Sequence, residues 1–376
     1  MSDRTGLQEL SADALAQGYA LAKRCLAEGK TEEAMGLCDK LQEAGPLAPA
    51  IYELRALASV QQQAHAAAFV DVRTALALAR RLGLPLQALS GLSDSLLPQV
   101  ANDVSLVAVS RACRTLRWLL SLYNDRAAEE ICDCLSPHFG SYAPVFAFFA
   151  GVCRMRRGRN ERAVADFEQA VVAAPNLWPA AVACGLALLK LDDKEGALRA
   201  FAFADTERAK AENTYMISEA EDALAFVSGE RFSWRSQVFS WAALLSELGR
   251  NDEALSVLRK WTEQEKDAAD AYLSQAVLCV ALRRFEEALA ALDLAQATLT
   301  EQDRTSEAWD PLLRIRELRA SALAALGRQP EPTPETPPAS TPETPPASTP
   351  ETPPASTPET PPESTPETPP ESTPDP

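Results

Sequence analysis

The sequence has few of the residues that usually carry catalysis or metal binding. Only 2 of its 376 residues are histidine, and it has no Walker-type phosphate loop, no glycine-rich dinucleotide fingerprint and no Gly-x-Ser-x-Gly elbow. The single metal-like grouping is Cys132, Cys134 and His138. On a helix, residues at i and i+2 point in different directions, and no second Cys or His pair lies nearby in the sequence. We therefore expect that the protein is not an enzyme and uses no metal and no cofactor.

Long apolar runs are also missing. The longest, 145–153 and 177–189, are shorter than the ~18 residues of a membrane span. Residues 1–16 carry charges and lack the continuous apolar stretch of a secretory signal. Most of the 8 cysteines lie in Ala/Leu-rich periodic segments, which is typical of reduced, buried thiols rather than of a disulfide framework. These features predict a protein without membrane insertion and a location in the cytoplasm.

Positive charge is scarce, since 36 Lys and Arg stand against 53 Asp and Glu and give a net charge of -17. Such a balance opposes binding to nucleic acid. The composition changes sharply at residue 329. Residues 329–376 hold 19 of the 28 prolines and nine acids but no Lys, Arg or Gly, so the preceding body has a charge of -17 + 9 = -8.

The body contains an internal repeat with a period of 34 residues. Small and apolar residues recur at this spacing in two places. The pairs are Gly151 with Gly185, Ala163 with Ala197, Phe167 with Phe201 and Ala170 with Ala204, and later Ala242 with Ala276, Ala254 with Ala288 and Leu258 with Leu292. This period is typical of a helix-turn-helix repeat. No alternating apolar and polar pattern persists long enough for a sheet, which predicts an all-α body.

The unit 144–177 resembles the tetratricopeptide repeat (TPR) family. That family places a small residue in its first helix, then Ala, an aromatic residue and Ala in its second, then Pro. Here Gly151, Ala163, Phe167, Ala170 and Pro175 occupy those positions. Small residues let the second helix approach the first, while the aromatic ring fills the space beside them. The resemblance implies a right-handed α-solenoid of TPR-like helix pairs.

Other units match the family pattern less completely. The unit 178–211 keeps Gly185 and Phe201 but has Ala209 where proline is usual. The units beginning near Arg235 and Ala269 have leucine in place of the aromatic residue, and the unit 15–48 is a moderate match. The stretches 49–143 and 205–234 are helical in pattern without the full signature. The sequence leaves open whether 49–143 continues the array or forms a separate helical lobe.

We therefore predict three regions. Residues 1–143 form an N-terminal helical region with one moderate and several degenerate units, and 144–328 form a TPR-like solenoid. The helix expected at 309–327 caps that solenoid, with Pro311 in its first turn and Gly327 at its end. Residues 329–376 form a disordered tail built on the octad TPETPP[AE]S, because dense proline cannot enter a helix or sheet. The tail could be a spacer, a ligand for polyproline-reading domains or a platform for modification.

The resemblance implies that partners bind in a concave groove lined by the first helix of each unit. At these positions the chain is mostly apolar, which favours a partner helix or extended peptide over a chaperone-type carboxylate clamp. The basic cluster at 154–162 could receive an acidic partner, or could be a solvated turn in which Arg162 pairs with Asp166. The candidate groove residues are Phe148, Val152, Met155, Arg156, Val182, Leu186, Leu189, Lys190, Phe239 and Leu273.

The predicted function is a non-catalytic protein-interaction scaffold or adaptor that binds a partner segment in the apolar groove and supports assembly of a multiprotein complex. Two alternatives remain at this point: an assembly or secretion chaperone for a client protein, and a regulatory subunit of an enzyme. The sequence identifies neither the partner nor the oligomeric state.

Overall fold

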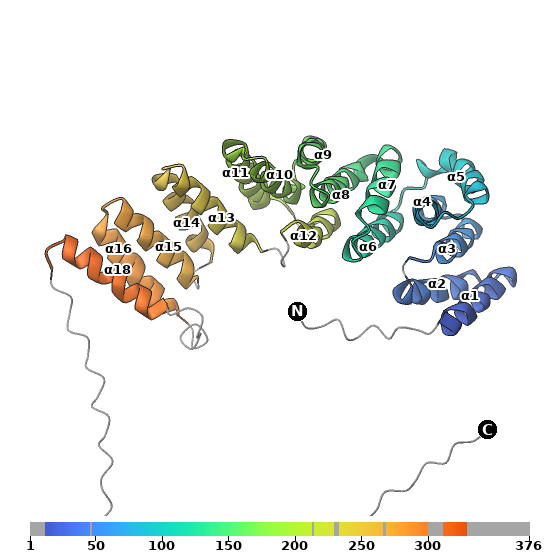
Figure 1. Ribbon diagram of the computed structural model, residues 1–376, viewed down its shortest axis with the longest axis horizontal. Coiled ribbons are helices and arrows are strands. Elements are labelled where there is room, and N and C mark those ends of the chain that lie inside the picture. Colours follow the sequence, from blue (N-terminus) through green and yellow to red (C-terminus); the bar gives the residue numbers. More distant parts are fainter. Residues whose placement is uncertain are drawn as a thin grey trace, which may run out of the picture. The chain divides into compact units, whose positions relative to one another are not determined.

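The computed structural model describes residues 12–45, 47–212, 214–228, 233–265, 268–299 and 311–328. Every regular element in these residues is a helix, which confirms the predicted all-α fold (Figure 1). Two short 3-10 turns, η1 (Ser136–His138) and η2 (Gly140–Tyr142), separate α7 from α8. The α-helices are α1 (Ala12–Ala27), α2 (Thr31–Ala44), α3 (Pro49–Gln61), α4 (His65–Leu82), α5 (Gln87–Val100), α6 (Leu106–Ser121), α7 (Asp125–Leu135), α8 (Ala143–Arg156), α9 (Asn160–Ala173), α10 (Trp178–Lys190), α11 (Lys194–Lys210), α12 (Tyr215–Ser228), α13 (Trp234–Glu247), α14 (Asn251–Gln264), α15 (Ala269–Ala281), α16 (Phe285–Thr298) and α18 (Pro311–Ala325).

Most of these helices form consecutive packed pairs, which follow one another along the body. The pairs α8/α9 and α10/α11 coincide with the two predicted units that match the family pattern best. In seven pairs the short turn holds one residue with a left-handed backbone. Glycine adopts this conformation without steric cost, but the array does not require it. The left-handed turn residues are Gly29, Gln63, Tyr123, Gly158, Asp192, Gly249 and Arg283.

The stretch 49–143 looks degenerate in sequence although it contains helix pairs of the same kind. The pairs α3/α4 and α6/α7 lie within it and turn in the same way as the others. Their second helices have Val72 and Cys132 where Phe167 and Phe201 follow the turn in the best-matching pairs, so the aromatic residue of the family pattern is missing. The largest apolar cluster contains residues from Tyr52 to Ala288 and so includes helices on both sides of residue 143.

Within a pair, the small residue of the first helix allows direct contact with the ring of the second. A Cβ atom added at Gly151 would lie 2.5 Å from Cε1 of Phe167, and one added at Gly185 would meet the ring of Phe201 in the same way. Phe167 and Phe201 are both buried. The 34-residue spacing of Gly and Phe therefore reports a close approach of two helix backbones.

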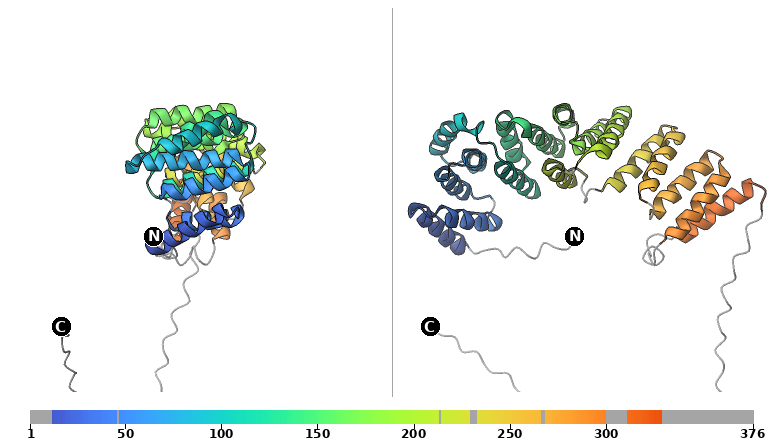
Figure 2. Two further views of the ribbon diagram at one scale, coloured as in Figure 1. Left: turned by 90° about the vertical axis from the view of Figure 1, so that its right-hand side faces the viewer. Right: turned by 180° about the vertical axis from the view of Figure 1, so that it is seen from behind.

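Two helices interrupt the succession of pairs. Helix α5 follows α4 and packs against it, and α12 stands between α11 and α13. Helix α12 packs against α6, α8 and α10 (Figures 1 and 2). The sequence 205–234 therefore lacks the repeat signature because part of it forms a helix that does not belong to a pair.

The last described helix, α18, packs against α15 and α16 through Ile315 and Leu318. Its start at Pro311 fits the predicted first-turn proline, whereas Trp309 and Asp310 of the predicted cap lie outside the described residues. The body forms one unit, Met1–Arg328. The octad tail also lies outside the described residues. Among the helices described, none is long and apolar enough to cross a membrane.

Candidate partner-binding site

The structure places five of the predicted groove residues inside the helical body. Phe148, Val152, Met155, Val182 and Leu273 are all buried. The ring of Phe148 packs against Phe167, with ring centroids 5.9 Å apart. In this conformation these five side chains belong to the hydrophobic core and form no surface that is open to a partner.

Helix α12 is one reason for this burial. It lies against α8 and α10, the first helices of the two best-matching units. Its buried face includes Ile217, Ala220, Ala223 and Leu224, whereas Ser218 on its opposite face is exposed. An amphipathic helix of this chain thus occupies the face that sequence analysis assigned to a partner.

Polar contacts hold α12 at its middle and near its end. At its middle, Arg117 of α6 forms ion pairs with Glu219 at 3.1 Å and with Asp222 at 2.5 Å. Near its end, the guanidinium of Arg156 lies 5.5 Å from the ring centroid of Phe226.

Arg156 is therefore engaged within the body rather than free for a ligand. Its Nη1 donates to the carbonyl oxygen of Leu120 at 2.8 Å, and its Nε lies 3.2 Å from Asp125 Oδ1. Its guanidinium also lies over the ring of Tyr123, 5.1 Å from the centroid. These contacts join α8 to the end of α6 and the start of α7.

The four remaining candidates retain some exposure. Leu186, Leu189 and Phe239 are half-buried and pack against the main apolar cluster. Lys190 is exposed at the end of α10. The structure does not gather the ten candidates around one open groove.

The basic cluster at 154–162 makes ion pairs with neighbouring helices. Arg154 of α8 pairs with Glu129 of α7 at 3.1 Å, with Asp133 at 2.7 Å and with Asp166 of α9. The expected partner of Asp166 was Arg162, but Arg154 reaches it from the adjacent helix. Burial, the largest effect, raises the pKa of Asp166, although Arg154 acts in the opposite direction.

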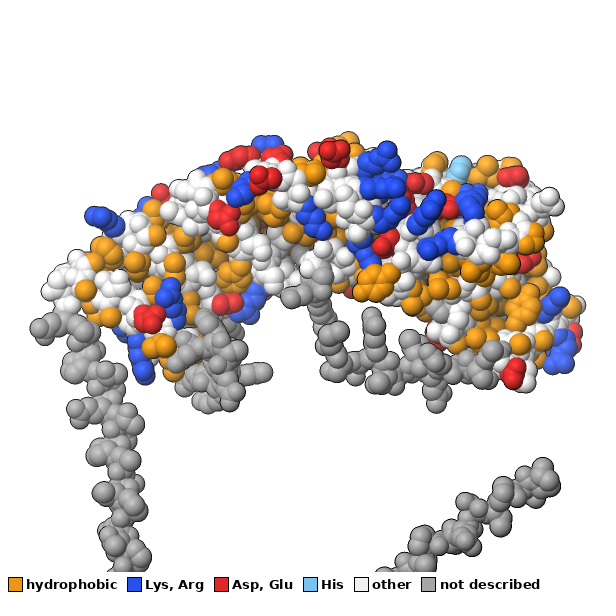
Figure 3. All heavy atoms as spheres, in the orientation of Figure 1, with side chains coloured by type: hydrophobic (Ala, Val, Ile, Leu, Met, Phe, Trp, Pro, Cys, Tyr) orange, Lys and Arg blue, Asp and Glu red, His pale blue; other side chains and the backbone are white. Residues whose placement is uncertain are grey.

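Acidic side chains of α7 and α9 therefore balance much of the positive charge of the basic cluster. Glu129 also accepts from Arg157 and lies 3.5 Å from Arg159. Figure 3 shows Lys and Arg side chains gathered over α7 and α8, with acidic side chains among them. Sequence spacing suggested a pairing along one helix, whereas the structure pairs charges between helices.

The cysteine and histidine grouping lies at the end of α7 and in the turn η1. Burial raises the pKa of the Cys132 thiol well above its ordinary value, so it is protonated at neutral pH. The His138 ring packs edge-on against Phe69, with centroids 5.8 Å apart. Within the described residues, no group of three or more His, Cys, Asp or Glu side chains could hold a metal ion.

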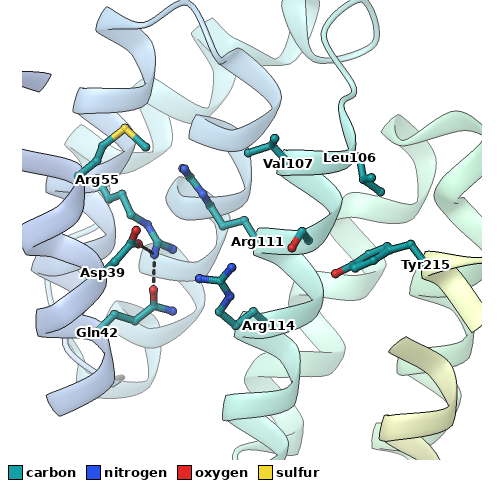
Figure 4. A pocket seen from close by; sticks show the side chains of 10 residues that line it. Asp39, Gln42, Arg55, Leu106, Val107, Arg111, Arg114 and Tyr215 are labelled. Carbon is teal, nitrogen blue, oxygen red and sulfur yellow. Dashed lines mark hydrogen bonds and ion pairs between the residues drawn. The ribbon is translucent and has the colours of Figure 1, made fainter. Parts of the chain in front are cut away.

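An open cavity of about 510 Å³ lies between α2, α3, α6 and α12 (Figure 4). Leu106 and Val107 at the start of α6 line it and are 50% and 66% exposed. Arg111 and Arg114, one and two turns further along α6, also line the cavity, and Tyr215 of α12 faces them from the other side. The cavity thus combines exposed apolar side chains with arginines.

A buried ionic network forms the floor of the cavity. Asp71 is fully buried and accepts from Arg55 Nε at 3.0 Å, Arg55 Nη2 at 2.6 Å and Arg111 Nη1 at 2.8 Å. Arg55 Nη1 also donates to Asp39 Oδ1 at 2.8 Å. Burial alone would lower the pKa of Arg55, but Asp71 and Asp39 outweigh it and hold the pKa above its ordinary value. Arg55 is thus a permanent cation fixed in one orientation.

Arg114 differs from the other two arginines of the cavity. It is exposed, and it makes no ion pair or hydrogen bond with any other described residue. Counting Arg55, Arg111 and Arg114 against Asp39 and Asp71 leaves one positive charge at the cavity. Arg114 can therefore receive a carboxylate from a ligand.

Sequence analysis did not identify this cavity. Its residues lie at 35–55, 106–114 and 215, and only folding brings these segments together. The available signal was the start of α6, where Leu106 and Val107 are consecutive apolar residues directly after the N-cap Ser105. Consecutive residues of a helix point about 100° apart, so one of two neighbouring apolar side chains can lie outside the core.

The turn geometry, the 34-residue succession of pairs and the Gly–Phe contacts give the body the architecture of a tetratricopeptide repeat array. No protein-family model and no curated protein matches the sequence.

Several solved structures are similar to the chain. That of yeast Tom70 is 13% identical with a TM-score of 0.36, covering 83% of this chain and 59% of Tom70. A chain of the APC/C hetero-tetramer Cut9-Hcn1 is 12% identical with a TM-score of 0.36, covering 85% and 57% of the two chains. The TPR2AB domain of yeast Sti1, in complex with pHSP90, is 16% identical with a TM-score of 0.27, covering 83% and 99%.

The chain thus spans less than two thirds of the Tom70 and APC/C chains that it matches. Because all three TM-scores are below 0.5, the assignment of the fold rests on the chain's own helix pairs.

Proposed function

We propose that the protein is a non-catalytic interaction scaffold that binds a partner segment in the cavity between α2, α3, α6 and α12. The segment presents an apolar side chain to Leu106 and Val107 and a carboxylate to Arg114. Binding at this place joins the partner to the body and supports assembly of a larger complex.

The exposed side chains at the start of α6 carry this proposal. Leu106 and Val107 are neighbours, are at least half exposed and border a cavity of about 510 Å³, so together they offer a partner an apolar surface beside the arginines. The network of Arg55, Asp71 and Arg111 fixes the floor, so little side-chain entropy is lost when a ligand binds.

The groove of α8 and α10 supports a partner less well in this conformation. Helix α12 covers part of this face, and Phe148, Val152, Met155 and Val182 are buried. We therefore place the partner segment at the cavity on the other side of α6, where Tyr215 of α12 forms part of the wall.

The test is a quantitative pull-down with the full chain. The cavity variant carries Val107→Glu and Arg114→Glu, and a matched control carries Val172→Glu and Arg162→Glu at exposed positions of α9. Circular dichroism must show equal helicity for all three proteins. We expect at least ~10-fold loss of a major partner with the cavity variant only, because anchors at interface centres dominate binding. Equal recovery with both variants would exclude this cavity as the binding site.

A further inference from the structure

A second cavity, at the junction between α11 and the pair α13/α14, is lined by three of the protein's six tryptophans. Its volume is about 240 Å³, and Trp234 and Trp241 of α13 and Trp261 of α14 line it. Val238 lies between the first two on the same face of α13, since 234, 238 and 241 have i, i+4, i+7 spacing. This cavity is separate from the one assigned to the scaffold function.

The cavity exists because α12 does not continue the stack. Elsewhere the first helix of a pair packs extensively on the second helix of the preceding pair, as α10 does on α9. Helix α12 packs on α6, α8 and α10 instead, and α13 makes only a limited contact with α11. The tryptophan face of α13 is therefore incompletely covered.

Internal packing accounts for part of this aromatic cluster. Trp234 is 8% exposed, its ring packs edge-on against Trp178 at 5.4 Å, and the guanidinium of Arg208 lies 4.9 Å from its centroid. Packing alone leaves two features unexplained. A cavity remains beside the rings, and the indole Nε1 of Trp261, a residue that is 8% exposed, has no hydrogen-bond partner among the described residues. Buried indole N–H groups usually find an acceptor.

We propose that this tryptophan cavity is a docking site for an extended, proline-rich peptide. Peptides in the polyproline II conformation have no internal hydrogen bonds, so their carbonyl groups are free to accept from a donor such as an indole N–H. Grooves lined by aromatic side chains bind such peptides because the flat rings pack against proline, and the peptide loses little entropy.

The charged residues at the cavity fit a peptide with few acids. Lys260 lines the cavity and pairs with Asp205, and its side chain is 51% exposed. Arg208 beside Trp234 interacts electrostatically with Glu221 of α12, so two cations and two acids surround the cavity and their charges balance. The ligand is therefore a proline-rich peptide with few charged residues. The sequence TPETPPAS, with three prolines, one glutamate and no cation, has this chemistry.

The experiment titrates a synthetic peptide of residues 333–348, two octads, into the body 1–328. The body is used because the full chain carries the same octads, and Met1–Arg328 forms a unit by itself. The tryptophans are labelled with 5-fluorotryptophan, and their fluorine resonances are assigned by substitution. We expect saturable shifts at Trp234, Trp241 and Trp261 but not at Trp118 of α6.

Matched variants locate the site. Trp241→Ala should weaken binding at least ~10-fold, as tryptophan anchors usually do, whereas Trp118→Ala, also at a half-buried tryptophan, should leave it unchanged. A peptide with alanine at all six prolines keeps the charge and should not bind.

The proposal is overturned if no saturable shift occurs, if the alanine peptide binds equally well, or if both tryptophan variants weaken binding alike. It is also overturned if the same resonances move with protein concentration alone, because a second copy would then occupy the cavity. None of these outcomes bears on the Val107 and Arg114 variants, so the two proposals can fail independently.

Discussion

The contact between Gly151 and Phe167 gives the sharpest test of how the repeat is built. A substitution of Gly151 by alanine places Cβ 2.5 Å from Cε1 of Phe167 and within 3.0 Å of two further ring atoms. This is about 1 Å closer than the ~3.5 Å at which two carbon atoms attract each other. Phe167 is fully buried against Phe148, so the ring cannot turn away into solvent.

Two opposing effects set the magnitude. Alanine in place of glycine in a helix interior stabilises by about 1 kcal/mol, whereas overpacking of a buried site costs about 1–3 kcal/mol. Gly36 provides a matched control, because it lies within α2, is exposed and has no atom within 4 Å of an added Cβ. The helix-propensity gain is common to both sites. Gly151→Ala should therefore be about 1–3 kcal/mol less stable than Gly36→Ala.

Hydrogen exchange of backbone amides, read by mass spectrometry, is the suitable assay because repeat arrays open locally. Peptides from 143–173 should exchange faster in Gly151→Ala, and peptides from 31–44 should exchange more slowly in Gly36→Ala. In a Phe167→Leu background the cost of Gly151→Ala should fall, since the shorter side chain removes the overlap. If both glycine substitutions stabilise equally, close approach does not explain the Gly–Phe spacing and the reasoning is wrong.

Three further perturbations test the ionic network, a buried phenol and a helix cap. Asp71→Asn should cost about 3–5 kcal/mol in urea unfolding, because it leaves Arg55 without its buried counter-charge; a loss below 1 kcal/mol would contradict this. Burial raises the pKa of Tyr52 to about 12 from 10.0. The raised pKa stabilises the folded state, and this stabilisation is fully present below pH 10. It is lost as the pH rises to 12, because Tyr52 ionises in the unfolded chain before it ionises in the folded protein. Between these pH values the free energy of unfolding of wild type should fall by about 2–3 kcal/mol more than that of Tyr52→Phe. If the two plots of unfolding free energy against pH run parallel, the prediction is wrong. Ser105 accepts from Ala108 N at 3.4 Å, so Ser105→Ala should lower the stability of α6 by about 1 kcal/mol in hydrogen exchange, and unchanged exchange at 106–121 would show that the cap contributes nothing.

The sequence by itself determined the kind of structure and its best-formed part. A period of 34 with Gly and Phe at fixed positions identified the pairs α8/α9 and α10/α11, because these residues are required by a contact within one unit. Residue spacing within one unit also predicted the helix pairs α1/α2, α13/α14 and α15/α16. It failed for α3/α4 and α6/α7, since their second helices have Val72 and Cys132 where Phe167 and Phe201 stand in the best-matching pairs.

Only the tertiary structure decided which apolar faces are covered. Periodicity shows that one face of α8 is apolar, but not that α12, more than 50 residues further along the chain, packs against it. For this reason Phe148 and Val182 became core residues, and Arg156 became a contact between helices. The two cavities likewise arise between segments distant in sequence, and Trp234 lines one of them because the helix before it packs elsewhere. Contacts within one repeat can be read from residue spacing, whereas contacts between distant helices depend on how the whole chain fills space.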